Sequence, residues 1–313
     1  MGGLISVIVP NRDGAEVIGA CLRSALAQTW PDFELIVVDD GSTDGSADLI
    51  ARDFPSATLV RLPAPTGFSG ACNAGLAGAK GEWIATLNSD AEADPEWLAR
   101  AMAAAGDDPT VTMIACRVLA GDGRTVDSLG LMLTAGGLSK LIGHGMPDSL
   151  SDHDAPPYEV FGLAGSAALY RRSAIEAAGF FAPELFAYYE DTEMAWRLRA
   201  AGGRCLLAPG AVVRHRHSHT AGRVGLDKRY YLQRNRLRTV ARNWPAGLIL
   251  RNLHRLLAVD LASIGVAVME GRPLSAARAR VDFLRALPSD LRARRTPAAD
   301  VGAWLGRETG GRP

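Results

Sequence analysis

Short apolar runs alternate with helical patterns along the first third of the chain. The runs at 4–9, 35–38, 57–62 and 83–87 contain few charged residues, which is typical of strands buried on both faces. Apolar or small residues at helical spacing predict helices over 17–27, 69–79 and 95–105. This order of strands and helices predicts an α/β fold, with a mostly parallel central sheet and helices on both of its faces.

The pattern changes after residue 110. Strand-like runs at 111–119 and 159–170 flank a glycine-rich middle at 121–145, which predicts hairpins or loops. The segment 148–157 is polar and rich in proline, so we expect a loop there. Apolar residues at helical spacing then predict a helix over 191–200.

The last part of the chain is basic and has a helical pattern. A strongly basic helix is expected over 226–243, where Trp244 and Pro245 end it, and an apolar run with arginines on one side follows at 248–269. Residues 1–210 carry a net charge of −13 and residues 211–313 one of +13. An acidic body suits divalent metals, whereas a basic extension suits phosphates, nucleic acid or anionic lipid.

Two arrangements of this basic extension remain open. Its helices either pack on the rest of the chain, or one of them lies on anionic lipid as an amphipathic interfacial helix. No stretch of 18 or more residues is free of charge, so a membrane-spanning helix is not expected. Nucleic acid is not an expected partner, because no aromatic residues are interleaved with the arginines.

The cysteines and the N-terminus bear on location. Cys21, Cys72, Cys116 and Cys205 are widely spaced and form no Cys-x-x-Cys pair, which argues against a disulfide framework and fits a reducing compartment. Residues 1–3 lead directly into a strand pattern, without the basic and apolar regions of a signal peptide. We therefore expect a cytoplasmic protein.

Two polar clusters follow strands of the predicted sheet. Asp39 and Asp40 follow the second strand, and Asn88, Ser89 and Asp90 follow the fourth. Ligands of parallel sheets bind at the carboxyl ends of the strands, so the first pair is a candidate for base and ribose contacts. The second cluster is a candidate site for Mg²⁺ or Mn²⁺, which prefer oxygen ligands and share phosphate oxygens. Capping of a turn or helix explains each aspartate equally well.

Two further clusters lie in the second half. Glu190 and Asp191 follow an aromatic run at 186–189, which could stack on a sugar and raise the carboxylate pKa for general-base work. Taken alone, a helix cap is the better explanation of this pair. Histidines at 215, 217 and 219 predict either a solvated basic loop or a metal ligand opposite Asp90, and zinc remains open although no cysteine joins them.

A glycine-rich stretch over 67–75 follows the third strand. It lacks the lysine of a phosphate-binding P-loop, and a dinucleotide fingerprint would follow the first strand instead. We expect it to allow close packing of a helix beneath the candidate base and ribose contacts.

Taken together, these motifs resemble family 2 glycosyltransferases with the GT-A fold, and most closely the bacterial rhamnosyltransferase-like branch. The resemblance covers about residues 4–243. It is carried by Ser6-Val7-Ile8-Val9-Pro10-Asn11, Val37-Val38-Asp39-Asp40-Gly41-Ser42, Gly67-Phe68 with Asn73 and Gly75, Gly81-Glu82-Trp83-Ile84, Leu87-Asn88-Ser89-Asp90, Val126-Asp127-Ser128-Leu129-Gly130, the block from Phe186 to Arg197, His215, and Tyr231 with Arg234-Asn235-Arg236.

The resemblance implies a role for each matching residue. Nucleotide contacts are implied for Pro10, Asn11, Asp39, Asp40, Asn73 and Ser89. Metal and diphosphate binding is implied for Asp90 and His215, with Mg²⁺ or Mn²⁺ as the cofactor. Asp191 matches the catalytic base with Glu190 beside it, and acceptor binding is implied for Tyr188, Tyr189, Trp196 and Arg197.

The implied activity is transfer of a sugar, rhamnose or another hexose, from a dTDP- or UDP-linked donor with inversion at the anomeric carbon. The acceptor would be a glycan or a polyprenyl-linked sugar of cell-wall or surface polysaccharide, at the inner face of the plasma membrane. We expect a GT-A catalytic domain over 1–225, made of a nucleotide-binding half (1–110) and an acceptor-binding half (111–225), and a basic helical extension over 226–313.

The chain departs from the family pattern at two positions, and two rival functions were considered. Asn88 stands where the metal motif usually has a carboxylate, and Thr66 stands where this branch commonly has asparagine. A non-catalytic nucleotide-sugar or glycan binding module would need neither Asp191 nor His215. A nucleotidyltransferase would carry a glycine-rich, basic loop after the first strand, where this chain has residues 11–14.

Overall fold

A mixed β-sheet forms the centre of the computed structural model, which describes residues 3–150, 152–216, 226–295, 297 and 299–307. Within these residues the sheet has ten strands, in the order β10-β12-β6-β11-β4-β1-β2-β3, with β5 on β12 and β7 on β6. The strands are β1 (Ile5–Asn11), β2 (Phe33–Asp39), β3 (Thr58–Arg61), β4 (Trp83–Leu87), β5 (Ala91–Ala93), β6 (Val111–Ala120), β7 (Val126–Ser128), β10 (Tyr158–Glu159), β11 (Ala167–Arg171) and β12 (Arg204–His215).

The first half of the sheet is parallel, as the sequence predicts. Strands β3, β2, β1 and β4 all run the same way, and β11 is antiparallel to both of its neighbours, β4 and β6. The three expected helices are present as α1 (Ile18–Leu26), α3 (Gly67–Gly78) and α4 (Trp97–Ala105), and a further helix, α2 (Ser46–Asp53), lies between β2 and β3. This α/β architecture confirms the predicted fold class.

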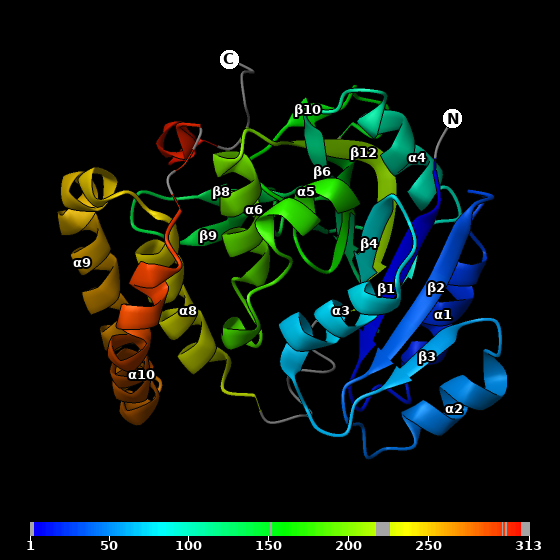
Figure 1. Cartoon of the computed structure of the whole chain (residues 1–313), viewed down its shortest axis with the longest axis horizontal. Helices are drawn as coiled ribbons and strands as arrows, with labels where there is room; N and C mark the ends of the chain where they lie inside the picture. The colour runs from blue at the N-terminus through cyan, green and yellow to red at the C-terminus, as the bar shows by residue number, and fades with distance from the viewer. Residues whose placement is uncertain (1–2, 151, 217–225, 296, 298, 308–313) are drawn as a thin grey trace.

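Alternate residues of the parallel strands serve two cores. Val7 and Val37 belong to a core with α1 and α4, whereas Ile8 and Ile36 face a second core with α3. Because the sheet is buried on each face, side chains on both sides of these strands contact a core. This explains why the strands are nearly continuous apolar runs. Figure 1 shows α3 in front of the sheet and α1 behind it.

Helix α3 packs on the sheet as closely as its glycines allow. A Cβ atom at Gly75 would lie 2.6 Å from the Cγ2 atom of Ile8, so only glycine fits there. The stretch 67–75 therefore brings a helix close to the sheet beneath the cleft, as expected from the sequence.

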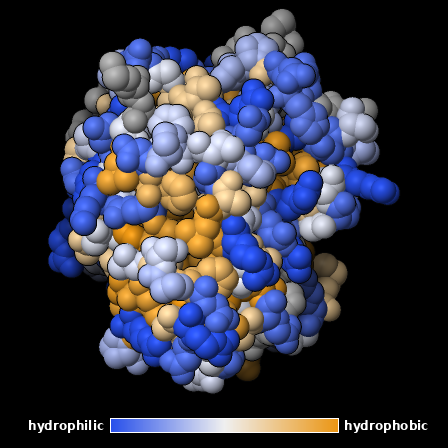
Figure 2. All heavy atoms as spheres, turned by 90° about the vertical axis from the view of Figure 1, so that its right-hand side faces the viewer, coloured by the Kyte–Doolittle hydropathy of each residue, from blue (hydrophilic) through white to orange (hydrophobic). Residues whose placement is uncertain are grey.

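Strand β3 forms one edge of the sheet. It is four residues long, and its terminal residues Thr58 and Arg61 are exposed. A short edge strand with a charged residue discourages pairing with another chain. Figure 2 shows this side of the molecule, where apolar side chains gather in the middle of the face and hydrophilic ones surround them.

Strand β12 is a long element that sequence analysis does not predict. It pairs in parallel with β6 and is interrupted between Ala208 and Val212 by a register shift. Pro209 and Gly210 lie in that irregularity, where proline's missing N–H costs no ladder hydrogen bond. The same two residues disguise the strand in the sequence, because they are typical of a turn.

The acceptor-side segment is more divided than expected. The run at 159–170 is not one strand: it contains the end of β10, a non-strand connection over 160–166 and most of β11, which is followed by the unpredicted helix α5 (Arg172–Ala178). The glycine-rich stretch does contain hairpin strands, β8 (Leu131–Leu133) and β9 (Ser139–Leu141). Short 3₁₀ turns are η1 (Asp148–Leu150) and η2 (Pro183–Leu185), and the predicted helix is α6 (Glu190–Ala200).

Three long helices follow at the left of Figure 1: α8 (Lys228–Asn243), α9 (Ala246–Met269) and α10 (Pro273–Arg292), with a last turn η3 (Val301–Trp304). Helix α8 is joined to α10 by the buried ion pair Arg238–Asp290, 2.9 Å between nitrogen and oxygen. Its C-terminal end is fixed to α6 by the stacked rings of Trp196 and Trp244. The extension thus packs on the rest of the chain, although most of α9 stays exposed.

Candidate functional site

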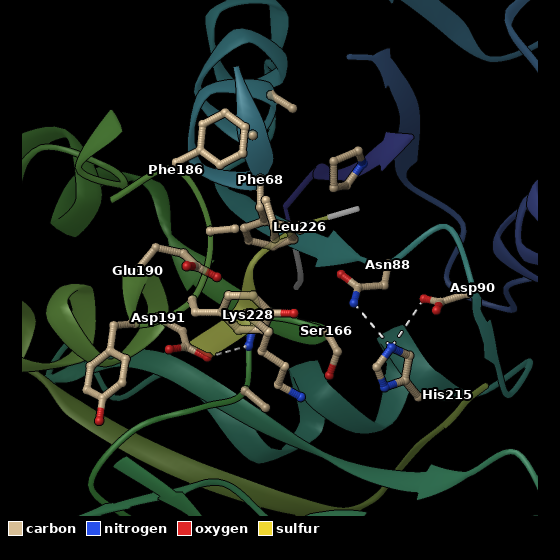
Figure 3. A pocket seen from close by; sticks show the side chains of 18 of the residues that line it. Phe68, Asn88, Asp90, Ser166, Phe186, Glu190, Asp191, His215, Leu226 and Lys228 are labelled. Carbon is tan, nitrogen blue, oxygen red and sulfur yellow. Dashed lines mark hydrogen bonds and ion pairs between the residues drawn. The ribbon is translucent and has the colours of Figure 1, made fainter. Parts of the chain in front are cut away.

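One cleft of about 440 Å³ gathers most of the predicted site residues. It opens where β1 and β4 end, so Pro10, Asn11 and Ser89 lie on its wall. Figure 3 shows Glu190 and Asp191 on one side of the cleft and Asp90 with His215 on the other. Residues far apart in the sequence therefore share one cavity, as the sequence-based hypothesis requires.

Asp39 and Asp40 are both buried and both bonded within the protein. Asp40 accepts hydrogen bonds from the backbone N–H groups of Thr66 (2.6 Å) and Gly67 (2.9 Å), at the start of α3. Asp39 accepts from Asn11 Nδ2 at 3.2 Å and does not line the cleft. Asp40 thus caps α3 and also forms part of the cleft wall, while its contact with a nucleotide stays a prediction.

His215 lies between two carboxylates at the end of β12. Its Nε2 atom is 3.2 Å from Asp90 Oδ1, and its Nδ1 atom is 3.0 Å from Asp127 Oδ2. Asn88 Nδ2 is also 3.2 Å from Nε2. Burial alone lowers the pKa of His215, but the hydrogen bonds to Asp127 and Asp90 outweigh it and raise the pKa to about 9.

The pair formed by Asp90 and His215 fits a divalent cation. Both donors face the cleft, and the same negative surroundings that favour a proton on His215 favour a metal ion in its place. Asp127 holds the other ring nitrogen, which is a common support for a metal-bound imidazole. In the described part of the chain no three His, Cys, Asp or Glu residues form a complete ligand set, so substrate oxygens would supply the rest. His217 and His219 lie outside the described residues.

Glu190 and Asp191 begin α6, where Glu190 is buried and Asp191 is partly buried. Asp191 accepts hydrogen bonds from the backbone N–H groups of Gly165 (3.2 Å) and Thr192 (2.6 Å), and from the Thr192 hydroxyl. Glu190 Oε2 has no hydrogen-bond partner within the described residues. Burial raises the pKa of both carboxyl groups, and the charge of Asp191 raises that of Glu190 further.

The segment that leads into this pair has an unusual backbone. Phe186, Tyr188 and Tyr189 all have positive φ angles, between 67° and 71°, which costs side-chain-bearing residues about 1–3 kcal/mol each. Its shape is held from α8, where Asn235 Nδ2 donates to the carbonyl oxygens of Leu185, Ala187 and Tyr188 at 2.7–2.9 Å. From the other side, α3 approaches so closely that a Cβ at Gly67 would lie 2.4 Å from the Phe186 carbonyl oxygen.

Residues 6–179, more than half of the chain, match the family described as Glycosyl transferase family 2. The chain belongs to glycosyl transferase family 2. An "N-acetylglucosaminyl-diphospho-decaprenol L-rhamnosyltransferase" of Mycobacterium tuberculosis is 28% identical to this glycosyltransferase over 225 residues, covering 64% of this chain and 72% of the relative. An uncharacterized protein of Sinorhizobium fredii is 27% identical over 77% of this chain, and the match spans only 27% of that longer protein.

Solved structures share the fold of this glycosyltransferase. S. aureus TarS (residues 1–349) in complex with UDP-GlcNAc superposes with a TM-score of 0.62 at 19% identity, over 92% of this chain and 83% of that chain. A mannosyltransferase from Pyrobaculum calidifontis in complex with GDP-Man and Mn²⁺ gives 0.56 at 20% identity, over 94% of this chain and 86% of that chain. The predicted GT-A fold is therefore confirmed.

Four of the predicted residues lie outside the cleft of this glycosyltransferase. Trp196 packs on Trp244 in the core, and Arg197 binds Glu193 and the carbonyl oxygens of 178–180. Asn73 donates to the carbonyl oxygen of Phe181, and Asp39 lies behind Asn11. Contact of these four with substrate stays a prediction, and their positions favour a supporting role.

Sequence reasoning assigns no role to Asp127 and Lys228, which line the cleft, or to Asn235, which supports it from α8. Asp127 supports His215, and Lys228, at the start of α8, lies over the Tyr188 ring with 5.6 Å from Nζ to the ring centroid. Asn235 shapes the approach to the carboxylates. Each belongs to a motif or helix noted in the sequence, but only the fold shows which partner it faces.

Proposed function

We propose that this glycosyltransferase moves a sugar, with inversion, from a UDP- or dTDP-linked donor to a hydroxyl of a polyprenyl-linked sugar or glycan. The observation that carries the proposal is the unequal pair Glu190 and Asp191 in the cleft. Asp191 receives three hydrogen bonds that favour its ionised form, whereas Glu190 has an oxygen without a partner among the described residues. Two carboxyl groups in such different surroundings take different protonation states, and the ionised one can act as a base.

In this mechanism Asp191 accepts the proton of the acceptor hydroxyl as its oxygen attacks the anomeric carbon. The bond from that carbon to the diphosphate oxygen breaks on the opposite face, and the nucleoside diphosphate leaves with the bonding electrons. Glu190 stays neutral, because burial and the neighbouring charge of Asp191 raise its pKa. One proton thus passes from the acceptor to the enzyme, and configuration inverts at the anomeric carbon.

We further propose Asp90 and His215 as the residues that hold Mg²⁺ or Mn²⁺ beside the diphosphate. When bound, the cation supplies positive charge that stabilises the leaving diphosphate. Asp127 fixes the ring orientation of His215, while Pro10, Asn11, Asp40 and Ser89 shape the wall for the nucleotide. The mannosyltransferase from Pyrobaculum calidifontis was solved in complex with GDP-Man and Mn²⁺, which supports the use of a divalent cation.

The acceptor side of the cleft suits a sugar with an apolar carrier. Phe68, Phe186 and Leu226 lie around the upper part of the cavity in Figure 3, and Tyr188 and Tyr189 line it as well. Aromatic faces and apolar walls of this kind bind sugar rings and hydrocarbon. The name of the mycobacterial relative, which acts on a decaprenyl-diphosphate-linked sugar, supports a lipid-linked acceptor.

The decisive experiment has two steps. A panel of UDP-, dTDP- and GDP-sugars is screened by thermal shift with Mn²⁺, because bound donor stabilises the fold by mass action. The stabilising donor is then incubated with short polyprenyl-diphosphate sugars, and the product's anomeric configuration is determined by NMR. An inverted product supports the proposal. Donor binding without transfer to any acceptor would instead favour a non-catalytic binding module.

A further inference from the structure

The exposed face of α9 carries a row of large apolar side chains. Leu250, Leu253, Leu257, Leu261 and Val268 recur at intervals of three, four or seven residues, so they form one stripe along the helix. Leu250 is 71% exposed and Leu261 is 68% exposed. Scattered apolar residues on a surface need no explanation, but a row from Leu250 to Val268 along one helix marks an interaction surface.

Another face of α9 is bound to the protein by polar contacts. Asp260 accepts from Arg236 of α8 (2.8 Å) and from Arg280 of α10 (2.9 Å), and Gln233 donates to the carbonyl oxygen of Ser263. By length and hydropathy alone α9 could cross a membrane, and only 17% of that apolar window is buried. Crossing would separate Asp260 from its two arginines and place it unpaired in hydrocarbon, which is costly. The helix is therefore suited to lie along a surface.

Charge identifies the kind of surface. Residues 246–295 contain nine arginines and four acidic residues. All four acids form ion pairs with arginines: Asp260 with Arg236 and Arg280, Glu270 with Arg229, Asp282 with Arg278 and Arg285, and Asp290 with Arg238 and Arg242. Exposed Arg251 and Arg255, which both lie to one side of the leucine row, have no carboxylate partner among the described residues. An apolar row beside positive charge is complementary to an anionic lipid bilayer.

We propose that α9 lies in the headgroup region of an anionic membrane, with its leucine row in the acyl boundary and Arg251 and Arg255 on lipid phosphates. Helix α10 adds exposed apolar side chains and arginines of its own, including Leu274, Leu284, Arg278 and Arg285. Helix α8 connects this surface to the cleft, because it begins at Lys228 in the cleft wall and packs against both α9 and α10. The inference rests on the proposed function in one respect: a polyprenyl-linked acceptor is anchored in the same bilayer.

The test is co-sedimentation of the full chain with vesicles, which needs neither donor nor acceptor. Wild type should pellet with phosphatidylcholine vesicles that contain phosphatidylglycerol and stay in the supernatant with phosphatidylcholine alone. The double variant Leu257→Ser/Leu261→Ser should lose at least about tenfold in partitioning, because two exposed leucines no longer enter the bilayer. The matched control Leu26→Ser/Met146→Ser changes exposed apolar residues elsewhere and should bind as wild type does.

A second pair of variants tests the charge. Arg251→Glu/Arg255→Glu should weaken binding and reduce its dependence on salt, whereas Arg52→Glu/Arg100→Glu, on exposed sites of α2 and α4, should not. Equal vesicle binding by wild type and the leucine variant would overturn the proposal. So would sedimentation showing that wild type is a dimer which the leucine variant dissociates, since the row would then bind a second copy. If transfer to every acceptor fails while vesicle binding persists, only the proposed function falls.

Discussion

The side-chain amide of Asn235 donates a 2.7 Å hydrogen bond to the carbonyl oxygen of Tyr188, two residues before the buried carboxylates begin. The same nitrogen lies 2.9 Å from the carbonyl oxygens of Leu185 and Ala187. Helix α8 thus supports a backbone that would not adopt positive φ angles by itself. A residue about 45 positions later in the chain sets where Glu190 and Asp191 point.

Asn235→Ala should therefore reduce turnover more than donor affinity. The strained segment would relax, and a displacement of about 1 Å at Asp191 is enough to lower kcat about 10²-fold. Donor affinity, measured by titration calorimetry, should stay within about threefold of wild type. The residues proposed to bind the nucleotide lie at the ends of β1, β2 and β4 and not in the strained segment. The control is Asn252→Ala, which removes a buried amide of α9 that bonds only within its own helix turn. Equal kcat values for both variants would contradict a positioning role.

Asp191→Asn should abolish transfer and leave donor binding intact. An amide cannot accept the acceptor proton, and loss of a general base typically costs about 10²–10⁴-fold in rate. The thermal shift produced by the donor with Mn²⁺ should match that of wild type within error. The exposed carboxylate of Glu184 provides the control Glu184→Gln, which should leave the rate unchanged. Turnover near the wild-type rate in the Asp191 variant would assign the base to another group.

Glu190→Gln should stabilise the protein, and increasingly so as the pH rises. The pKa of Glu190 is raised in the folded state, so its contribution to stability is complete below the unfolded pKa and is lost as pH rises through the folded pKa. A permanently neutral amide avoids that loss, and a gain of about 1–3 kcal/mol is expected at neutral pH, with little difference near pH 4. Tm measured across this range tests it, with exposed Glu176→Gln as the control. A Tm difference that is independent of pH would mean that Glu190 does not titrate in this range.

The sequence predicts the parallel half of this fold well because each element there carries its own signal. Apolar runs give β1, β2 and β4, and polar residues at their ends give the cleft wall. Strand β12 escapes prediction because Pro209 and Gly210 lie at a bulge that only its pairing with β6 makes possible. Contacts such as Asn235 with Tyr188, or Asp127 with His215, depend on tertiary packing and have no local pattern.

Asp127→Asn tests the last such contact through metal affinity. Asp127 accepts from one ring nitrogen of His215 and so presents the other nitrogen toward Asp90. Asparagine keeps the shape but loses the charge, and loss of such a support costs about 10–100-fold in metal affinity. Affinity is measured as the Mn²⁺ concentration that gives half of the UDP-dependent thermal shift. The control Asp122→Asn changes an exposed aspartate of the neighbouring turn, whose hydrogen bonds stay within that turn. If both variants need the same Mn²⁺ concentration as wild type, Asp127 does not support His215 as a metal ligand.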